Sequence, residues 1–491
     1  MRYFLKFWAF GVKSLAVLAV VVWTMPCLAF NLTKATPWKK AVVTVDATVS
    51  RAAYEPLGRH SSGGFICDLK RGWIVTTHDV VGHGGVVATY EVTFSGGQKL
   101  EANLVYADPS KNFAILKFDP KKLIVEVSEM GQFAETSSLS AEVLLLAKAG
   151  EQDIVQQGLV SALYESVSFI PQEAIRISLN ASGGLALGGF VVNEKGQVLG
   201  LVISQDQTFV SVLRGSFIQD ALVDLKAEKK PVRRRIVGGL FYSTPLADAV
   251  RYSKFPKEEL KAFMAKYPEA LLQGLVCRLK TTEDSPFMPG DVLVSVDGKD
   301  VGPSLYTLES HLNKVSGRTV KVGLFRRGKK IEVEAPLEDL DPFPIRQMVL
   351  FGGATFYQAD KQLALQFNVP EGAVVVSYAL PGSPFANLFP GMWWGSEARS
   401  VSVIESIQGY PVASLTDLMG LIPTLLKDEY CELTYRNYAF GVAFGNLTTN
   451  RGSQLGSVDL SGLNMLSENL SFSLKTMSWT SRPAEMGGQK P

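Results

Sequence analysis

The feature that most constrains the fold is a series of short β-rich segments between residues 40 and 222. They include "AVVTVDATV", "GWIVTT", "FAILKFD", "EVLLLAKAG" and "QVLGLVIS", and Gly, Asp-Pro or Ser-Gly sequences separate them. No long amphipathic helix lies between these segments. Many short strands at regular spacing are typical of an antiparallel barrel or sandwich. The sequence therefore predicts a mainly β domain over residues 38–225.

Beyond this region the chain repeats itself. A basic segment, "KAEKKPVRRRIV", predicts a linker over residues 226–237. After it, "VLVSVDGKDVGPSLYTLESHL" recurs about 111 residues later as "VSVIESIQGYPVASLTDLMGLI". Each copy predicts a strand, a tight Gly turn, a second short strand and a helix. With "IVGGLFYSTPL" and "LFGGATFYQ" ahead of them, the copies resemble two PDZ domains, over residues 238–340 and 345–451.

The mainly β region carries three segments that resemble the HtrA/Deg family of serine proteases. These are "SSGGFICDLKRGWIVTTHDVV", "VTFSGGQKLEANLVYADPSKNFAILKFD" and "GGFVVNEKGQVLGL", and they occur in the family's order. The family also carries PDZ domains behind its protease domain. The resemblance implies a trypsin-like double β-barrel followed by two PDZ (α+β) domains, and it implies trimers packed through the barrels.

The same registers locate the family's three catalytic positions. The histidine falls on Asp79, the aspartate on Asn112 and the serine on Leu187. A serine nucleophile needs a base with a pKa near the working pH, and that base must return its proton to the leaving amine. An aspartate with an unperturbed pKa of ~3.9 is a poor base and is almost fully ionised, and leucine has no side-chain heteroatom. We therefore expect a pseudoprotease, without catalytic residues.

A displaced catalytic pair stays open as an alternative. Ser182 in "NASGG" offers a hydroxyl, and His78 is next to the expected histidine position. Using Ser182 inserts five residues before the strand "FVVN", which would disturb the turn that forms an oxyanion hole. His78 is shifted by one residue, which turns a side chain away from its neighbour's direction. His83 lies in the glycine-rich "GHGG" and is expected to be a loop residue.

A metal site and a cofactor are not expected. His78, Asp79 and His83 form an "HDxxxH" cluster, but the surrounding glycines favour a loop without a ligand geometry. The three cysteines outside the N-terminal segment are scattered and predict buried apolar positions rather than a disulfide framework. They are Cys67, Cys277 and Cys431.

Peptide binding would not need the catalytic residues. PDZ domains add an incoming peptide to a sheet edge, and glycine-rich loops can turn backbone N–H groups toward a C-terminal carboxylate. Either Gly-Gly pair could also be a simple strand turn. The predicted peptide-binding residues are Gly238, Gly239, Leu240 and Phe241 in the first copy, and Gly352, Gly353, Ala354, Thr355 and Phe356 in the second.

The two ends of the chain predict export and flexibility. Residues 1–29 have basic residues, an apolar run and small residues at the end, which is typical of a cleaved secretory signal peptide. An uncleaved membrane anchor over residues 14–30 is the alternative. Both predict a periplasmic or secreted protein, and membrane contact only in the second case. The tail, residues 452–491, is rich in Ser, Asn, Leu and Gly and predicts a flexible segment or an amphipathic docking segment near Leu460–Leu474.

Composition and motifs together predict a binding protein. The 491 residues are enough for about three domains, and 49 Lys and Arg against 47 Asp and Glu give no general attraction for nucleic acid. We expect an exported, proteolytically inactive HtrA-like protein that binds peptide C-termini or unfolded polypeptides as a scaffold, adaptor or chaperone in protein quality control. The alternatives are an active serine endopeptidase and a structural subunit that regulates an active relative.

Overall fold

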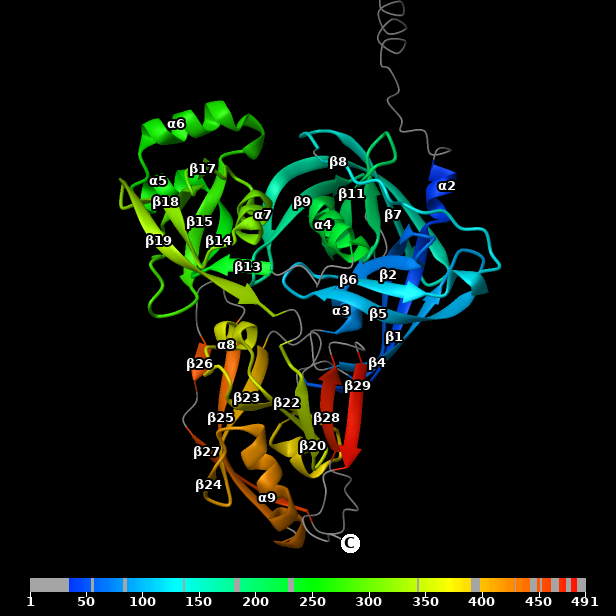
Figure 1. Cartoon of the computed structure of the whole chain (residues 1–491), viewed down its shortest axis with the longest axis vertical. Coiled ribbons are helices and arrows are strands. Elements are labelled where there is room, and N and C mark those ends of the chain that lie inside the picture. The colour runs from blue at the N-terminus through cyan, green and yellow to red at the C-terminus, as the bar shows by residue number, and fades with distance from the viewer. Residues whose placement is uncertain are drawn as a thin grey trace, which may run out of the picture.

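The structure is a computed structural model in which two β-barrels are followed by two α+β domains (Figure 1). It describes residues 35–483 except for 54–56, 83–85, 136, 181–185, 228–233, 342–343, 390–397, 429, 442–447, 451–452, 461–467 and 474–477. The predicted signal peptide and the alternative anchor lie outside the described residues, as do Ser182 and His83. Within the described part of the chain, no helix has the length and apolar character needed to cross a membrane.

The first barrel is a closed six-stranded sheet in the order β1-β2-β3-β6-β5-β4. Its strands are rich in β-branched and aromatic residues, which suit a pleated surface that is half buried. They are β1 (Val42–Ala52), β2 (Gly58–Asp68), β3 (Trp73–Thr77), β4 (Val86–Thr93), β5 (Lys99–Asp108) and β6 (Phe113–Phe118). Three short helices accompany the barrel: α2 (Thr36–Lys39), α3 (His78–Val81) and η2 (Pro120–Lys122).

The second barrel is also closed, in the order β10-β11-β12-β9-β8-β7. Its strands are β7 (Glu142–Ala149), β8 (Gln152–Val167), β9 (Gln172–Leu179), β10 (Phe190–Val192), β11 (Val198–Gln205) and β12 (Phe209–Arg214), and helix α4 (Gly215–Lys226) follows them. One core joins the barrels. Phe65 on β2 and Phe190 on β10 pack with ring centroids 5.0 Å apart. We call residues 35–227 the barrel domain.

Residues 234–340 form the domain that contains the first predicted PDZ copy, and we call it the first PDZ-like domain. Its sheet runs in the order β13-β19-β18-β16-β15-β14, with β17 beside β16. In β19, Ile331, Val333 and Ala335 alternate with the exposed Glu332 and Glu334, as expected for a strand with one covered face. The elements are β13 (Arg234–Val237), β14 (Gly239–Pro245), α5 (Leu246–Tyr252), α6 (Lys257–Lys266), η3 (Pro268–Ala270), β15 (Gln273–Lys280), β16 (Val292–Val296), β17 (Lys299–Asp300), α7 (Leu305–Lys314), β18 (Thr319–Arg326) and β19 (Lys329–Leu340).

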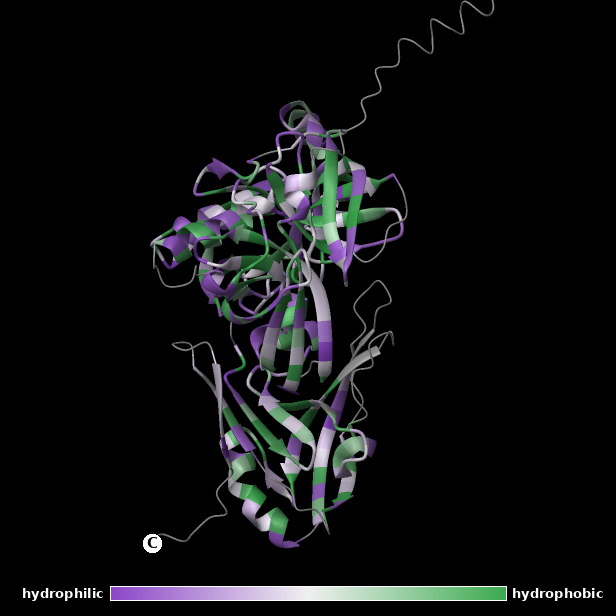
Figure 2. Cartoon of the chain, turned by 90° about the vertical axis from the view of Figure 1, so that its right-hand side faces the viewer, coloured by the Kyte–Doolittle hydropathy of each residue, from purple (hydrophilic) through white to green (hydrophobic). Residues whose placement is uncertain are grey.

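Residues 345–483 form the domain that contains the second predicted PDZ copy, and we call it the second PDZ-like domain. Its ten-stranded sheet runs in the order β26-β25-β23-β22-β21-β20-β28-β29, with β24 beside β23 and β27 beside β25. Figure 2 shows hydrophilic and hydrophobic residues alternating along several of its strands. The elements are β20 (Gln347–Phe351), β21 (Ala354–Gln358), α8 (Lys361–Phe367), β22 (Val374–Ala379), η4 (Pro384–Asn387), β23 (Ala398–Ile407), β24 (Tyr410–Pro411), α9 (Leu415–Asp428), β25 (Tyr430–Gly441), β26 (Thr448–Asn450), β27 (Gln454–Asp459), β28 (Glu468–Ser473) and β29 (Ser478–Pro483).

Two predicted boundaries need correction. The predicted linker, 226–237, ends in strand β13, which pairs with β19 along four residues. The predicted flexible tail, 452–491, contains three strands, because β27 pairs with β25 and β28 with both β20 and β29. These polar segments are ordered by backbone hydrogen bonds to strands that lie far away in the sequence. The composition of a segment does not reveal such distant partners.

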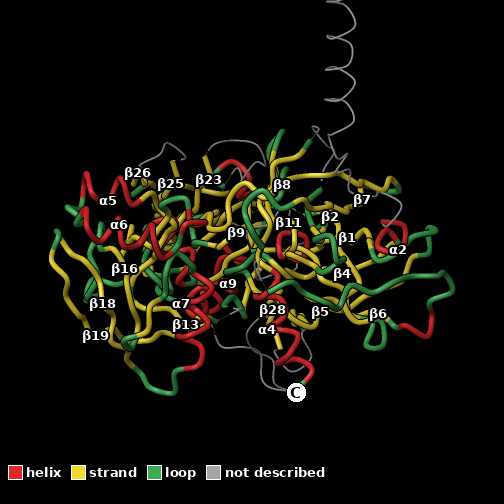
Figure 3. Tube along the Cα trace, turned by 90° about the horizontal axis from the view of Figure 1, so that it is seen from above, coloured by secondary structure: helices red, strands yellow, loops and turns green. Residues whose placement is uncertain are grey.

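The first PDZ-like domain lies beside the barrel domain, and the second lies below both in the view of Figure 1. The view from above in Figure 3 also shows β18 and β19 on one side and β5 and β6 on the other. The second PDZ-like domain contacts the end of β1, where Ala53 is buried in a cluster with Ile345 and Met348. The three cysteines named above are free and buried, as predicted.

Candidate functional site

Asp79 and Asn112 form a hydrogen-bonded pair at one end of the first barrel. Asp79 lies in α3, directly after β3, and Asn112 lies in the turn between β5 and β6. The Oδ1 atom of Asn112 accepts the backbone N–H of Asp79 at 3.1 Å, and its Nδ2 donates to Oδ2 of Asp79 at 2.8 Å. The two positions that the resemblance assigns to a histidine and an aspartate therefore lie together.

The backbone also favours asparagine at position 112. Its φ of 54° is in the left-handed region, where Asn is several times more common than most residues. The turn that holds this conformation is closed by Asp108, whose Oδ1 accepts the backbone N–H of Lys111 at 3.1 Å. Asn112 thus has a structural role in the turn as well as a contact with Asp79.

Leu187 lies in the turn before β10, between the two barrels. Its carbonyl accepts the backbone N–H of Gly63 at 2.8 Å and the hydroxyl of Ser62 at 3.2 Å. Gly188 has φ of 76°, and a Cβ there would lie 2.0 Å from the carbonyl oxygen of Gly63. Only glycine allows the two backbone segments to approach so closely. The turn is therefore built around Leu187-Gly188-Gly189.

Two hydroxyl groups join this turn to the Asp79 side, and sequence reasoning missed them. The Oγ of Ser62 lies 3.1 Å from Oγ1 of Thr77, the residue that precedes α3. In the described part of the chain, the partners of Ser62 are this hydroxyl and the Leu187 carbonyl. Neither of these two partners is a base near neutral pH, so neither can activate the Ser62 hydroxyl. The motif "SSGG" gave no signal of this contact.

The three side chains at positions 79, 112 and 187 offer no nucleophile and no neutral base for acyl transfer. An amide at Asn112 does not titrate, a carboxylate at Asp79 replaces the base, and Leu187 has no nucleophilic atom. His78, one of the displaced candidates, is a buried residue of α3 with 2% of its surface exposed. The structure describes neither Ser182 nor His83. Among the residues it does describe, no three His, Cys, Asp or Glu side chains form a group that could hold a metal ion.

The Asn112 turn also holds the first PDZ-like domain. Nε of Arg234, on β13, donates to Oδ2 of Asp108 at 2.6 Å, and both side chains are buried. Ser110 and Tyr106 donate to the same carboxylate. Burial alone would raise the pKa of Asp108, but the charge of Arg234 and the hydrogen bond from Ser110 hold it below its ordinary value. Asp108 is therefore an ionised anchor between the domains.

Helix α7 is fixed to the barrel domain by two further charged contacts. Nζ of Lys111 donates to Oε1 of Glu309 at 2.6 Å, although burial raises the pKa of Glu309 against the effect of that lysine. At the start of the helix, Glu173 on β9 accepts the Ser304 hydroxyl and the backbone N–H of Tyr306, each at 3.0 Å. A carboxylate at a helix N-terminus is favoured by the helix dipole.

The groove between β14 and α7 in the first PDZ-like domain faces the barrel domain. The Ser243 N–H on β14 donates to Oγ of Ser166 at 2.7 Å, and its own hydroxyl donates to the Tyr164 carbonyl at 2.7 Å. Ile170 and Pro171, from the turn after β8, line the groove, and a cavity of about 30 Å³ remains. The predicted residues Gly239, Leu240 and Phe241 also line this groove, while Gly238 precedes it. Strand β14 is an edge strand of its sheet, with the barrel domain against its outer side.

The corresponding strand of the second PDZ-like domain has no open edge. Strand β21 pairs with β22 on one side and with β20 on the other. Gly352 and Gly353 have φ of 60° and 77° and form the two-residue turn between β20 and β21. Two positive φ values in a two-residue hairpin favour Gly-Gly. The expected sheet edge at Ala354, Thr355 and Phe356 is thus filled by the chain itself.

Comparison with known proteins agrees with the barrel architecture. The family model described as "Trypsin-like peptidase domain" matches residues 62–201. The chain is 24% identical over 415 residues to Pro-apoptotic serine protease NMA111 of Scheffersomyces stipitis, which covers 81% of this chain and 40% of that protein. It is 26% identical over 410 residues to the NMA111 protein of Phaeosphaeria nodorum, covering 78% and 38%. Residues 62–201 are thus similar to trypsin-like peptidase domains, and the relatives that the chain resembles are named serine proteases.

The chain spans about two fifths of the length of the curated relatives it matches. Among solved structures it is similar to HtrA-type protease AlgW with tripeptide, with 17% identity and a TM-score of 0.44, covering 65% of this chain and 98% of that one. The relatives are named serine proteases. In this chain, Asp79, Asn112 and Leu187 stand at the positions that the resemblance assigns to the catalytic residues.

Proposed function

We propose that this chain is an exported, non-proteolytic HtrA-like protein that binds peptides or unfolded polypeptides as a scaffold, adaptor or chaperone. The observation that carries the proposal is the Asp79–Asn112 pair beside the Leu187 turn. The backbone of the site is present, and the groups that attack and transfer protons are replaced. Loss of the nucleophile alone costs on the order of a millionfold in kcat in a well-studied serine protease.

Peptide binding is proposed at the β14 edge of the first PDZ-like domain. Side chains hold this edge against the barrel domain, and the β14 backbone donates to one of them, the hydroxyl of Ser166. A peptide that pairs with β14 must displace Ser166 and the Ile170-Pro171 turn. Binding is therefore coupled to separation of the two domains. Export is proposed from the N-terminal segment of the sequence alone.

A cleavage and binding assay tests the proposal. The purified chain, from residue 30 onward, is incubated with unfolded casein beside an active HtrA-type protease and beside a Ser182→Ala variant. We expect intact casein with the wild-type chain and with the variant, and capture of immobilised C-terminal peptides. Casein cleavage that disappears in the variant would show that the displaced-pair alternative is right.

A structural subunit that regulates an active relative is the second candidate. Both PDZ-like strand edges are covered in this structure, one by β8 and one by β20, which favours a protein without free peptide sites. In this case no C-terminal peptide would be captured, and the chain would change the casein cleavage rate of an active HtrA-type protease when the two are mixed.

A further inference from the structure

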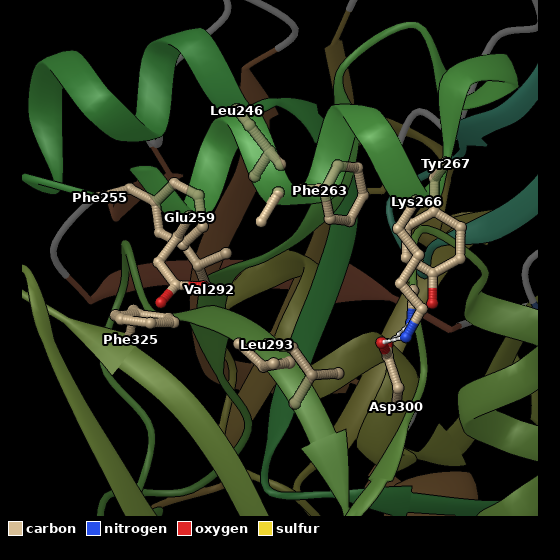
Figure 4. Close-up of a pocket in the computed structure, with 14 residues that line it drawn as sticks. Leu246, Phe255, Glu259, Phe263, Lys266, Tyr267, Val292, Leu293, Asp300 and Phe325 are labelled. Atoms are coloured by element: carbon tan, nitrogen blue, oxygen red, sulfur yellow. Dashed lines mark hydrogen bonds and ion pairs between the residues drawn. The ribbon is translucent and has the colours of Figure 1, made fainter. Parts of the chain in front are cut away.

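The first PDZ-like domain contains a second hollow, between its inserted helices and its sheet. The hollow has a volume of about 170 Å³, and only residues of this domain line it (Figure 4). It shares no lining residue with the β14–α7 groove. In contrast to that groove, the barrel domain contributes nothing to its walls.

The hollow exists because α6 covers the sheet without filling the space beneath it. The segment between β14 and β15 forms α5, α6 and η3. None of the ten residues of α6 is fully buried, and Leu260 and Phe263 are the apolar residues of this helix that pack against the core beneath it. The sheet below therefore keeps an apolar surface that the helix roofs only in part.

The walls are apolar and suit one bulky side chain. Leu246, Phe255, Val292, Leu293 and Phe325 line the hollow, and each is at most 5% exposed. Pockets for drug-sized ligands or cofactors usually measure about 300–1,000 Å³, so this one is too small for such molecules. An aromatic or branched aliphatic side chain is the group whose size and polarity match it.

The rim carries a net negative charge. Lys266 forms an ion pair with Asp300 at one end of the opening and lies 5.4 Å from the ring centroid of Tyr267. Glu259 lies on the opposite side, close to Phe255 and Val292 in Figure 4. Within the described part of the chain, Glu259 has no ion-pair partner. One carboxylate therefore remains for a cation on the ligand.

We propose that this hollow binds a bulky apolar side chain of a polypeptide that carries Lys or Arg next to it. The apolar side chain enters between Phe263 and Phe325, and the basic neighbour pairs with Glu259. The site goes beyond the proposed function, because it needs neither a free C-terminus nor an open β14 edge. It gives the protein a preference for basic, apolar internal segments of unfolded chains.

The test uses fluorescein-labelled peptides with both ends blocked, so that no free carboxylate can engage the PDZ-like loops. Three Gly-Ser peptides differ only in their centre: Lys-Phe-Lys, Glu-Phe-Glu and Lys-Ala-Lys. Fluorescence anisotropy with the full chain is expected to show binding of Lys-Phe-Lys. Lys-Ala-Lys should bind about tenfold or more weakly, because the buried ring is missing. Glu-Phe-Glu should bind about twofold to fivefold more weakly, because an exposed ion pair contributes little.

Two variants and one matched control separate the site from other surfaces. Ala262→Trp places a large ring at the exposed mouth of the hollow and should abolish binding of Lys-Phe-Lys. Glu259→Lys should reverse the preference between the two charged peptides. Glu258→Lys is the control, because Glu258 is the exposed preceding residue and does not line the hollow. Circular dichroism checks that all three are folded.

Several results would overturn the proposal. They are equal affinity for the three peptides, no binding of any of them, and binding that Ala262→Trp leaves unchanged. Self-association of the wild-type chain that Ala262→Trp abolishes would instead assign the hollow to a second copy of the chain. Capture of C-terminal peptides is a separate measurement, so failure here and failure of the proposed function can be told apart.

Discussion

The two PDZ-like domains begin with the same Gly-Gly element and use it in opposite ways. In the first, β14 lies at the edge of its sheet, and side chains of the barrel domain cover that edge. In the second, β21 lies inside its sheet, because β20 folds back through the Gly352-Gly353 turn and pairs with it. One substitution can remove a side chain that covers a strand edge. A strand that is paired through its backbone cannot be removed in this way. The first domain is therefore the one that can open.

The largest effect is expected from breaking the buried pair that holds the first domain. Asp108→Ala leaves the buried guanidinium of Arg234 without its counter-ion, and removing one partner of such a pair costs about 3–5 kcal/mol. We expect a loss of unfolding free energy of this size in urea, with faster amide exchange in β13 and β14.

Glu91→Ala is the control, since it removes an exposed pair with Lys99 and should cost less than about 1 kcal/mol. Equal stability of the two variants would mean that Asp108 does not anchor the domain.

A smaller loss is expected from opening the turn that fills the second domain's edge. Gly352 has φ of 60°, and a Cβ there would lie 2.1 Å from Cε2 of Phe385. Gly352→Ala should therefore cost about 2–3 kcal/mol and expose β20 to amide exchange. Gly298→Ala, in the first domain, is the matched control: φ is 73° and the added Cβ meets nothing within 4 Å, so only backbone strain of about 1 kcal/mol remains. If both variants lose the same stability, the contact with Phe385 plays no part.

The second domain should also respond to pH through Asp360, the N-cap of α8. Burial raises the pKa of Asp360 from 3.8 to about 6, against the hydrogen bond from the Leu363 N–H. The folded state therefore keeps this proton at a pH at which the unfolded chain has lost it, so stability falls as pH rises from about 4 to 6. Because the residue is partly exposed, we expect the free energy of unfolding to fall by about 1–2 kcal/mol over this range.

Asp360→Asn keeps the cap and should remove this part of the pH dependence in denaturation curves. An unchanged pH profile would contradict the assignment.

The smallest effect is expected from removing the Ser166 hydroxyl, which covers the edge of β14. Ser166→Ala removes the acceptor of the Ser243 N–H, and such a hydrogen bond contributes about 1 kcal/mol. We expect amide exchange at Ser243 to become about fivefold faster, with no change in β21. Ser161→Ala, on the same strand, removes a hydroxyl that donates to the Arg176 carbonyl within the barrel, and it should leave Ser243 unchanged. Similar exchange in both variants would show that the cover does not depend on Ser166.

Local sequence patterns predicted the elements better than their partners. The short β-rich runs predicted the barrels, and the apolar spacing of Leu415, Leu418, Ile422 and Leu425 matches the buried face of α9. The strands of the C-terminal tail were missed, because segments such as "ENLSFS" are polar and gain order from β20 and β29. Pairing between distant segments is a property of the whole fold, and composition of one segment does not contain it.

At the candidate site, too, the sequence predicted local features better than contacts between distant segments. The registers around Asp79, Asn112 and Leu187 located positions that the fold brings to one end of the barrels. The hydroxyl contact between Ser62 and Thr77 could not be found from the sequence, because Ser and Thr side chains form hydrogen bonds in many settings. The covered edges of β14 and β21 were also missed, since they depend on how domains and strands are placed next to one another.

We propose that the barrels keep the backbone of a protease site without a nucleophile. Intact-mass spectrometry of the purified chain, after incubation with a fluorophosphonate probe, tests it most directly, because the probe adds a fixed mass to an activated serine. We predict an unmodified chain under conditions in which an active HtrA-type protease is fully labelled. A single adduct on the wild-type chain that is absent from Ser182→Ala would contradict the account.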